Sequence, residues 1–431
     1  MRFWGRSSLL IFAKRSGSFY LSPINLSYWW NFGVFALYFL LAQIITGVLL
    51  ATLYNPSIHL AYSVIMEINN DVYYGWWLRY LHANGASLFS LPVYLHMFRG
   101  IYYGSFVHPR QLLRMSGMVI FILMIITAFL GHILPWGQMS FRAAMVITSL
   151  LAAIPLIGAD LIFSLRGGYS IQDVTLHRFH SLHFFFPFII LAVAIVHILF
   201  LHEFGSSSPI GLSSVLDGIP FTPYYVLKDG WSVISVTFIL FIIINISPDL
   251  FGHSVNYEKA NFLITPPHIV PEWYLLFLYA ILRSVTNKLF GFFLMVCSIV
   301  ALFFLRLLPK GFIIRSSVFK PWHAVWFWFF SVTCLLSSRI GSLPVIDPYL
   351  GVGQFLTVSY SMILLIFSPL GGPIEHLIYD AYIYLAIEEE EEVGLYCIDK
   401  VNTLSGLTFS KLIKKYSEDF LKFYNKVCLY I

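Results

Sequence analysis

The sequence predicts an all-α polytopic membrane protein with eight transmembrane helices. Hydrophobic residues make up 58% of the chain and charged residues only 11%, whereas soluble domains usually contain about 25% charged residues. The apolar residues are gathered into long stretches separated by polar loops, as expected for helices that cross a bilayer. Two of these stretches also carry histidines at the same separation, which indicates paired sites inside a helix bundle.

Charge and cysteine usage exclude several classes of function. In a membrane chain the formal charge of +5 reflects the loops of one membrane face, so we expect no nucleic-acid partner. The four cysteines form no CxxC or CxxCH unit, which argues against an iron–sulfur cluster, a zinc site or covalently attached haem within this chain. They are Cys297, Cys334, Cys397 and Cys428. Residues 1–25 lack the pattern of a cleaved signal peptide, so insertion should rely on the mature spans.

The eight spans follow from apolar stretches interrupted by Pro, Gly and charged residues. They are expected at residues 30–53, 76–103, 112–134, 175–202, 231–246, 288–308, 323–340 and 349–370. The long loop 135–174 contains short apolar helical pieces that Pro and Gly interrupt, so we expect it to lie on or partly inside the membrane surface instead of crossing. A second long loop, 247–286, contains a short apolar helix.

The distribution of Lys and Arg predicts the orientation. Eighteen of the 26 Lys and Arg residues fall on the face that holds both termini, and such residues concentrate on the cytoplasmic or matrix side. The chain divides into four segments. The first two are an inner-face segment 1–29 and a four-helix bundle 30–204 with the outer-face loop 135–174. The other two are helices five to eight at 205–372 with the loop 247–286, and a C-terminal extension 373–431 with a solvated acidic run at 388–392.

Histidines in the second and fourth spans indicate two metal centres. His82 and His96 are fourteen residues apart, and so are His183 and His197. Fourteen residues of α-helix rise about 21 Å and turn about 40° short of four full turns, so each pair shares a helix face at two depths. Two facing pairs suit two bis-histidine, non-covalent b-type haems, so the first four spans would form a di-haem bundle. Hydrogen-bonded histidines within a plain helix bundle are the alternative.

Glycines in the first and third spans repeat the same step. Gly33 and Gly47, and Gly117 and Gly131, are the only pairs among the 28 glycines that lie fourteen residues apart. A glycine lets a flat macrocycle approach the helix backbone. We therefore expect these spans to flank the haems, with simple helix packing as the alternative.

Two arginines sit near the histidines of the second span. Arg79 lies three residues before His82, and Arg99 three residues after His96. Haem propionates require cations or hydrogen-bond donors at the membrane edges, and these arginines are suitable partners. The alternative is that both are interfacial arginines whose charged ends reach the lipid headgroups.

The chain resembles the cytochrome b family, the haem-bearing core of respiratory complex III, over residues 29–380. The motifs that carry the resemblance are WWNFG, LRYLHANGAS, RGIYYGS, LPWGQMSF, FLHEFGSSSP, TPPHIVPEWY and YAILRS. PEWY at positions 271–274, together with the doubled histidine spacing, is highly specific. The photosynthetic members resemble this chain less, since the corresponding protein there is split into two chains.

The resemblance implies an electron-transfer subunit coupled to proton translocation. Such a protein oxidises ubiquinol at the outer face and reduces ubiquinone at the inner face. His82 and His183 would hold the low-potential haem, and His96 and His197 the high-potential haem. The implied partners are a Rieske iron–sulfur protein, a membrane-anchored c-type cytochrome and accessory complex III subunits, in a homodimer that could join a supercomplex. The implied location is the mitochondrial inner membrane with termini in the matrix, a bacterial plasma membrane being the alternative.

The resemblance also assigns residues to both quinone sites. Glu272 of PEWY would accept a proton from quinol, although it could instead tether its loop, and Tyr279 would share this pocket opposite residues 135–141. At the inner face His202, Lys228 and Asp229 would serve quinone reduction. Asp229 could alternatively cap the fifth helix.

Several positions depart from the family pattern. Arg142 and Ala143 replace Trp-Gly, His132 replaces a tyrosine, and Arg114 and Arg166 replace tryptophans. The methyl group of Ala143 should exclude inhibitors of the strobilurin type. Two other functions compete with electron transfer. One is an ion-coupled transporter that uses intramembrane histidines as a proton relay, and the other is a haem-bearing scaffold without catalysis.

Overall fold

The computed structural model describes residues 20–211, 217–304, 315–371, 374–375 and 377. Three predicted features lie outside these residues. They are the basic N-terminal segment with Arg2, Arg6, Lys14 and Arg15, the end of the sixth span after residue 304, and nearly all of the C-terminal extension with its acidic run.

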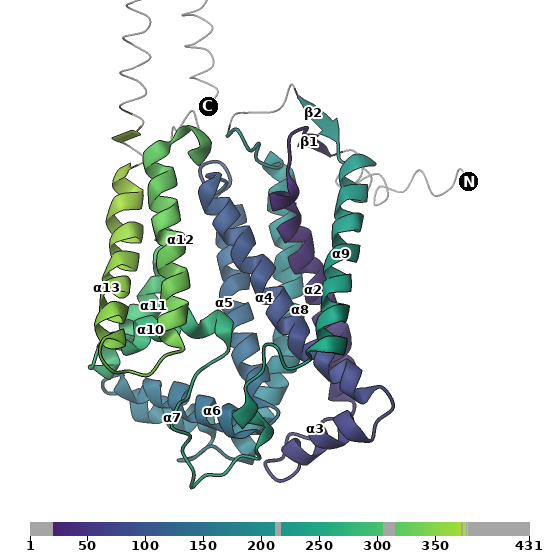
Figure 1. The fold of residues 1–431 in the computed structure, drawn as a ribbon, viewed down its shortest axis with the longest axis vertical. Coiled ribbons are helices and arrows are strands. Elements are labelled where there is room, and N and C mark those ends of the chain that lie inside the picture. The colour runs from purple at the N-terminus through teal and green to yellow at the C-terminus, as the bar shows by residue number, and fades with distance from the viewer. Residues whose placement is uncertain (1–19, 212–216, 305–314, 372–373, 376, 378–431) are drawn as a thin grey trace, which may run out of the picture.

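Long helices dominate the structure and run side by side (Figure 1). They lie at each of the eight places where the sequence predicts a span. They are α2 (Phe32–Ala51), α4 (Gly75–Tyr102), α5 (Gln111–Ile133), α8 (Asp173–Phe204), α9 (Tyr224–Ile246), α11 (Lys288–Phe304), α12 (Pro321–Gly341) and α13 (Tyr349–Met362). The π-helical turn η9 (Ile363–Phe367) prolongs α13, and the 3₁₀ turn η3 (Tyr28–Asn31) precedes α2.

Six of the described helices are long and apolar enough to cross a membrane. They cover Tyr28–Ala51, Gln111–Ile133, Asp173–Phe204, Tyr224–Ile246, Pro321–Gly341 and Tyr349–Gly371. The other two expected spans differ from these. α4 is 28 residues long but carries many polar side chains, and α11 has only 17 described residues. The all-helical class is therefore confirmed, and six of the eight predicted spans have the length and apolarity of a membrane helix.

Short helices cover one end of the long helices, as predicted for the loop 135–174 (Figure 1). They are α6 (Gln138–Leu150), η4 (Leu151–Ala153) and α7 (Gly158–Arg166). The loop 247–286 contributes η5 (Ser254–Tyr257), η6 (Trp273–Leu275) and α10 (Leu276–Arg283). At the opposite end β1 (Leu21–Pro23) pairs antiparallel with β2 (Gly218–Pro220), and η8 (Ser317–Phe319) precedes α12.

Two helix boundaries differ from the expectation. α9 begins at Tyr224, seven residues before the expected start of the fifth span, and its N-cap is Pro223. Lys228 and Asp229 therefore lie inside the first turns of α9, and the alternative that Asp229 caps this helix is wrong. The amphipathic helix α3 (Ala61–Asn70) was not expected, and it buries Ala61 and Ile68.

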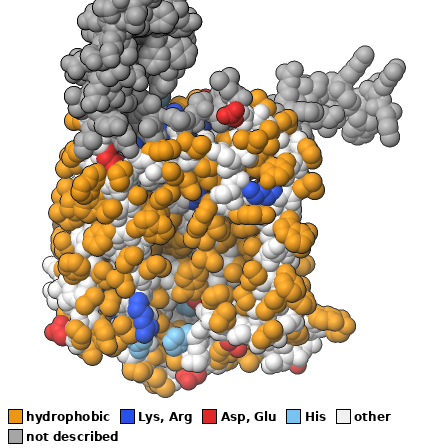
Figure 2. Space-filling model, turned by 45° about the horizontal axis from the view of Figure 1, so that its top comes forward, with side chains coloured by type: hydrophobic (Ala, Val, Ile, Leu, Met, Phe, Trp, Pro, Cys, Tyr) orange, Lys and Arg blue, Asp and Glu red, His pale blue; other side chains and the backbone are white. Residues whose placement is uncertain are grey.

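Apolar side chains face both the interior and the outside. One buried cluster joins the long helices through residues such as Phe39, Phe121 and Ile190, and a second lies beneath the short helices around Trp136 and Phe179. The outer surface is also apolar, and Figure 2 shows hydrophobic side chains over most of the visible face. On α9 this surface includes Trp231, Ile234, Phe238 and Phe241, which are 53 to 67% exposed. Such a continuous apolar surface fits a lipid environment.

Candidate haem and quinone sites

The four histidines form two facing pairs between α4 and α8. The ring centres of His82 and His183 are 6.2 Å apart, with the ring planes at 86°. The ring centres of His96 and His197 are 6.3 Å apart, with the planes at 60°. α4 and α8 thus each supply one histidine to each pair, as the common step of fourteen residues predicts.

Each pair fits a metal held by two imidazoles. Bonds of about 2.0 Å from one metal ion to two imidazole nitrogens would place the ring centres about 6 Å apart. Within the part of the chain that the structure describes, no group of three His, Cys, Asp or Glu side chains could hold a metal. Two protein ligands at one site suit haem, because the porphyrin supplies the other four nitrogens.

Hydroxyl groups orient two of the imidazoles. Thr46 Oγ1 lies 2.9 Å from His82 Nδ1, and Ser116 Oγ lies 2.9 Å from His197 Nδ1. The Thr46 hydroxyl donates its own hydrogen to the Ala42 carbonyl at 2.7 Å, and the Ser116 hydroxyl donates to a backbone carbonyl at 2.8 Å. Both oxygens therefore accept from Nδ1–H, which leaves the Nε2 lone pair of each histidine available to a metal.

The other two imidazoles have different partners. His183 Nδ1 lies 2.9 Å from the Thr127 carbonyl oxygen, an acceptor, so its Nε2 is also available. His96 Nδ1 lies 3.0 Å from Arg99 Nη2, which can only donate. In this arrangement the hydrogen of His96 sits on Nε2, so ligation requires Arg99 to turn away. Arg99 Nε is buried and has no partner among the described residues.

Each of the four glycines gives room to one imidazole. A Cβ atom added at these glycines would lie 2.4 to 3.2 Å from Cε1 of a histidine ring, closer than nearly all real Cβ contacts. The pairs are Gly33 with His96, Gly47 with His82, Gly117 with His197 and Gly131 with His183. The expectation was clearance for the macrocycle. The glycines instead leave room for the imidazole rings. Each glycine lies beside one histidine, which explains why the glycines and the histidines are both spaced fourteen residues apart.

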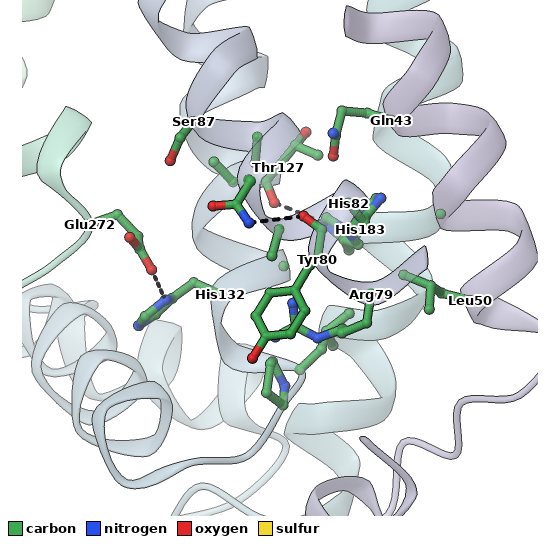
Figure 3. A pocket seen from close by; sticks show the side chains of 18 of the residues that line it. Gln43, Leu50, Arg79, Tyr80, His82, Ser87, Thr127, His132, His183 and Glu272 are labelled. Atoms are coloured by element: carbon green, nitrogen blue, oxygen red, sulfur yellow. Dashed lines mark hydrogen bonds and ion pairs between the residues drawn. The ribbon is translucent and has the colours of Figure 1, made fainter. Parts of the chain in front are cut away.

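A cavity of about 310 Å³ extends from the first histidine pair toward the loop 247–286. His82 and His183 line one part of it, and Arg79, His132 and Glu272 line others (Figure 3). This volume lies in the range of small-molecule sites in proteins. One cavity is therefore lined both by the first histidine pair and by the carboxylate that the resemblance assigns to quinol oxidation.

Glu272 is bonded to a residue that departs from the family pattern. His132 Nδ1 and Glu272 Oε1 are 2.8 Å apart, and the two side chains are 12% and 26% exposed. His132 lies near the end of α5 and Glu272 directly precedes η6. The bond also ties the loop to α5, so the tethering alternative for Glu272 stays open.

Tyr279 lies on α10 and outside the lining of this cavity. Its hydroxyl donates to the Ile269 carbonyl at 3.1 Å, and the guanidinium of Arg283 lies 5.0 Å from its ring centre. Of the expected opposite wall, Pro135 lines the cavity, and Trp136 is fully buried beside it.

Three of the unusual arginines have identifiable contacts. Arg142 Nε donates to the Ile264 carbonyl and Arg142 Nη2 to the Phe262 carbonyl, each at 3.1 Å, so this side chain ties α6 to the loop 259–264. Arg166 Nε donates to Thr148 Oγ1 at 2.9 Å and joins α7 to α6. Arg114 lies 4.8 Å from the Phe106 ring centre. The neighbouring Ala143 is buried in α6, and its effect on inhibitors stays a prediction.

At the opposite end, His202 lies in the last turn of α8 against the N-terminal segment. Its ring centre is 4.8 Å from that of Tyr20, and the Tyr20 hydroxyl lies 3.3 Å from Ser206 Oγ. Burial raises the pKa of Tyr20, so this phenol keeps its proton and can donate a hydrogen bond.

Lys228 contacts the same N-terminal segment from α9. Its Nζ donates to the Leu26 carbonyl at 2.6 Å and lies 4.6 Å from the Tyr28 ring centre. Asp229 follows it and is half-buried. The residues expected at the inner quinone site thus lie on two helices, α8 and α9, and both helices contact residues 20–28.

The residues that orient the imidazoles were missed in the sequence. A signal was nevertheless present, because Thr46 and Ser116 directly precede Gly47 and Gly117. A residue one position before a glycine lies on the neighbouring part of the helix surface, so a hydroxyl group there can also reach the histidine ring. Thr127 could not have been found, since it acts through its backbone carbonyl.

Two family models match most of the chain. Residues 18–205 match the model described as cytochrome b/b6/petB, and residues 259–361 match cytochrome b(C-terminal)/b6/petD. The chain is 46% identical to cytochrome b of Dictyostelium discoideum over 354 residues, which cover 82% of this chain and 91% of the relative. It is 47% identical to cytochrome b of Rickettsia prowazekii over 362 residues, which cover 83% and 90%.

A solved structure shares the fold. A chain described as hyperthermophilic respiratory complex III superposes with a TM-score of 0.81 at 31% sequence identity. The match covers 86% of this chain and 98% of the other.

Proposed function

This chain belongs to the cytochrome b family and is an electron-transfer subunit of respiratory complex III, and from that premise we propose its reaction. It oxidises ubiquinol near the outer face, carries electrons through two non-covalent b haems, and reduces ubiquinone near the inner face, with protons released outside and taken up inside. The enzyme as a whole is a quinol:cytochrome c oxidoreductase that requires further subunits.

The two facing histidine pairs carry this proposal. Their ring spacings of 6.2 and 6.3 Å, the hydroxyl and carbonyl acceptors on three of the Nδ1 atoms, and the glycine beside every ring all suit haem ligation. His82 and His183 would hold the outer, low-potential haem, and His96 and His197 the inner, high-potential haem. When bound, each haem accepts one electron and passes it on.

Arg79 and Arg99 are proposed partners of the haem propionates. Arg79 lines the cavity beside His82. The unpartnered Arg99 Nε is a buried donor, and a carboxylate that drew Arg99 away from His96 would satisfy this donor and free His96 for ligation.

The quinone sites are proposed at the two ends of the bundle. Glu272 is the candidate proton acceptor at the outer site, and the cavity beside the first histidine pair supports that role. Tyr279 is proposed at the same site from the resemblance, although it lies outside the cavity lining. At the inner site His202, Lys228 and Asp229 would deliver protons to the quinone, since imidazole, ammonium and carboxylate groups can relay protons.

We place all eight long helices across the mitochondrial inner membrane, with both termini in the matrix. α4 buries its polar residues Asn84, Ser87 and Ser90 within the protein, which supports it as a seventh span. α11 would be the eighth span. The resemblance supports a Rieske iron–sulfur protein, a c-type cytochrome, accessory subunits and a second copy of the complex as partners.

Spectroscopy of the purified complex tests this proposal. We expect reduced b-type absorption bands equivalent to two haems per chain, and reduction of these haems on addition of ubiquinol. An ion-coupled transporter would show no such bands, and a scaffold without catalysis would show the bands but no reduction by ubiquinol. Either result would contradict electron transfer between the two quinone sites.

A further inference from the structure

The bond between His132 and Glu272 changes how a proton could leave the quinol. An ionised carboxylate can only accept hydrogen bonds, so the 2.8 Å contact requires that His132 Nδ1 carry a hydrogen. In neutral His132 the lone pair then sits on Nε2. That atom is shielded from solvent and has no hydrogen-bond partner among the described residues.

A buried nitrogen without a partner lowers stability, so its retention calls for an explanation. The ring cannot rotate to find another partner without breaking its bond to Glu272. His132 also lines the cavity that reaches the first histidine pair, and Figure 3 shows its ring beside Glu272, joined to it by the hydrogen bond. A hydroxyl donor entering this region would give Nε2 its missing partner.

We propose that His132 Nε2, oriented by Glu272, is the immediate proton acceptor for quinol in this chain. This inference rests on the proposed function and deepens it, because it transfers the role of proton acceptor from Glu272 to His132. The quinol O–H bond breaks, an N–H bond forms at Nε2, and the oxygen keeps the electron pair. One electron then leaves to a one-electron acceptor of complex III, and the second hydroxyl group keeps its proton in this step. Glu272 stabilises the resulting imidazolium, as a carboxylate does in other carboxylate–imidazole pairs.

The far wall of the cavity provides a route for the released proton. The Tyr80 hydroxyl lies 3.0 Å from the Tyr257 hydroxyl, and the Tyr257 hydroxyl donates to Asp249. All three side chains line the same cavity as the His132–Glu272 pair, and Tyr257 is 46% exposed at the end covered by the short helices. This hydroxyl chain connects the cavity with the outer face.

Substitution in the intact complex tests the assignment. The rate of b-haem reduction by a short-chain ubiquinol is measured after the inner quinone site has been blocked. With His132→Gln we expect a fall of about 100-fold, the usual effect of losing a positioned base, at unchanged haem content. Glu272→Gln should also lower the rate, and the double variant should be no slower than His132→Gln, because the two residues act as one unit. His59→Gln is the matched control, because His59 is exposed and lies outside the lining of the cavity.

Chemical rescue separates a chemical role from a structural one. In a His132→Gly complex, added imidazole should raise the rate at least tenfold, while the wild type and His59→Gln should not respond. If His132→Gln does not assemble, His132→Phe fills the space without a nitrogen and should show the same loss. A rate within threefold of the wild type in His132→Gln or His132→Phe would overturn the inference. Absence of ubiquinol-driven reduction in the wild type would instead overturn the proposed function.

Discussion

Hydrogen bonding decides which ring nitrogen of each proposed ligand histidine is available to a haem iron. Thr46 and Ser116 accept from Nδ1 at 2.9 Å, and neither lies on a helix that supplies a ligand. Such partners fix the tautomer and orientation of a ligating imidazole, and their loss typically lowers metal affinity or activity about 10–100-fold. The flanking helices α2 and α5 therefore contribute chemically to the proposed haem sites and do more than enclose them.

Ser116→Ala tests this contribution at the inner site. Without the hydroxyl, His197 Nδ1 loses its acceptor, so we expect haem loss from this site or a displaced midpoint potential. Reduced-minus-oxidised spectra with potentiometric titration would measure both. Ser116→Thr retains the hydroxyl and should resemble the wild type. An unchanged potential and haem content in Ser116→Ala would show that orientation comes from packing.

Gly131→Ala tests the clearance around His183. The added Cβ would lie 2.4 Å from His183 Cε1, so the ring must shift, and we expect loss of the outer haem from the spectrum. Gly100→Ala is the matched control because nothing lies within 4 Å of its added Cβ. This control should bind both haems. Full haem content in Gly131→Ala would contradict the role assigned to this glycine.

At the scale of the helices, α12 depends on a residue far along the chain. No side chain at its N-cap, Lys320, caps the helix. Glu375 Oε1 instead accepts from the backbone nitrogens of Trp322 at 2.7 Å and His323 at 3.2 Å. A carboxylate at this position also interacts favourably with the helix dipole. The beginning of the C-terminal extension therefore has a structural role.

Glu375→Ala should destabilise this end of the molecule by about 1 kcal/mol, the usual cost of a lost N-terminal cap. The thermal denaturation midpoint of the purified complex would report the loss. Glu375→Gln keeps an acceptor oxygen and should recover most of the stability. Equal midpoints for the wild type and Glu375→Ala would mean that the cap contributes nothing.

The elements show what a sequence pattern can and cannot reveal. The repeated step of His82 and His96 was readable because it belongs to one helix period. The start of α9 could not be read from the sequence, because Lys228 and Asp229 lower the local hydropathy although the backbone stays helical. The bond from His132 to Glu272 joins positions 140 residues apart, and no local pattern contains such a contact.

The whole molecule has two different ends. The short helices α3, α6 and α7 lie at one end, and the β1–β2 pair lies at the other, with the long helices between them (Figure 1). In the proposed orientation, which follows the positive-inside rule, the β1–β2 end faces the matrix. The cavity with Glu272 then lies toward the intermembrane space, where quinol oxidation would release its protons.

Surface labelling tests this sidedness. Tyr169 is 92% exposed in the outer-face loop, and Asp217 is exposed next to β2. In a background with Cys397 and Cys428 replaced by serine, an impermeant maleimide should label Tyr169→Cys in intact mitoplasts. Asp217→Cys should react only after the membrane is permeabilised. The reverse pattern would invert the proposed orientation.

The division of ligands between α4 and α8 has a consequence for biosynthesis. Each proposed iron site takes one histidine from α4 and one from α8, and α8 ends only at Phe204. A nascent chain that has inserted its first three spans therefore holds single histidines and no complete site. Cofactor loading must wait for the fourth span to enter the membrane, so haem supply and membrane insertion act in a fixed order during assembly.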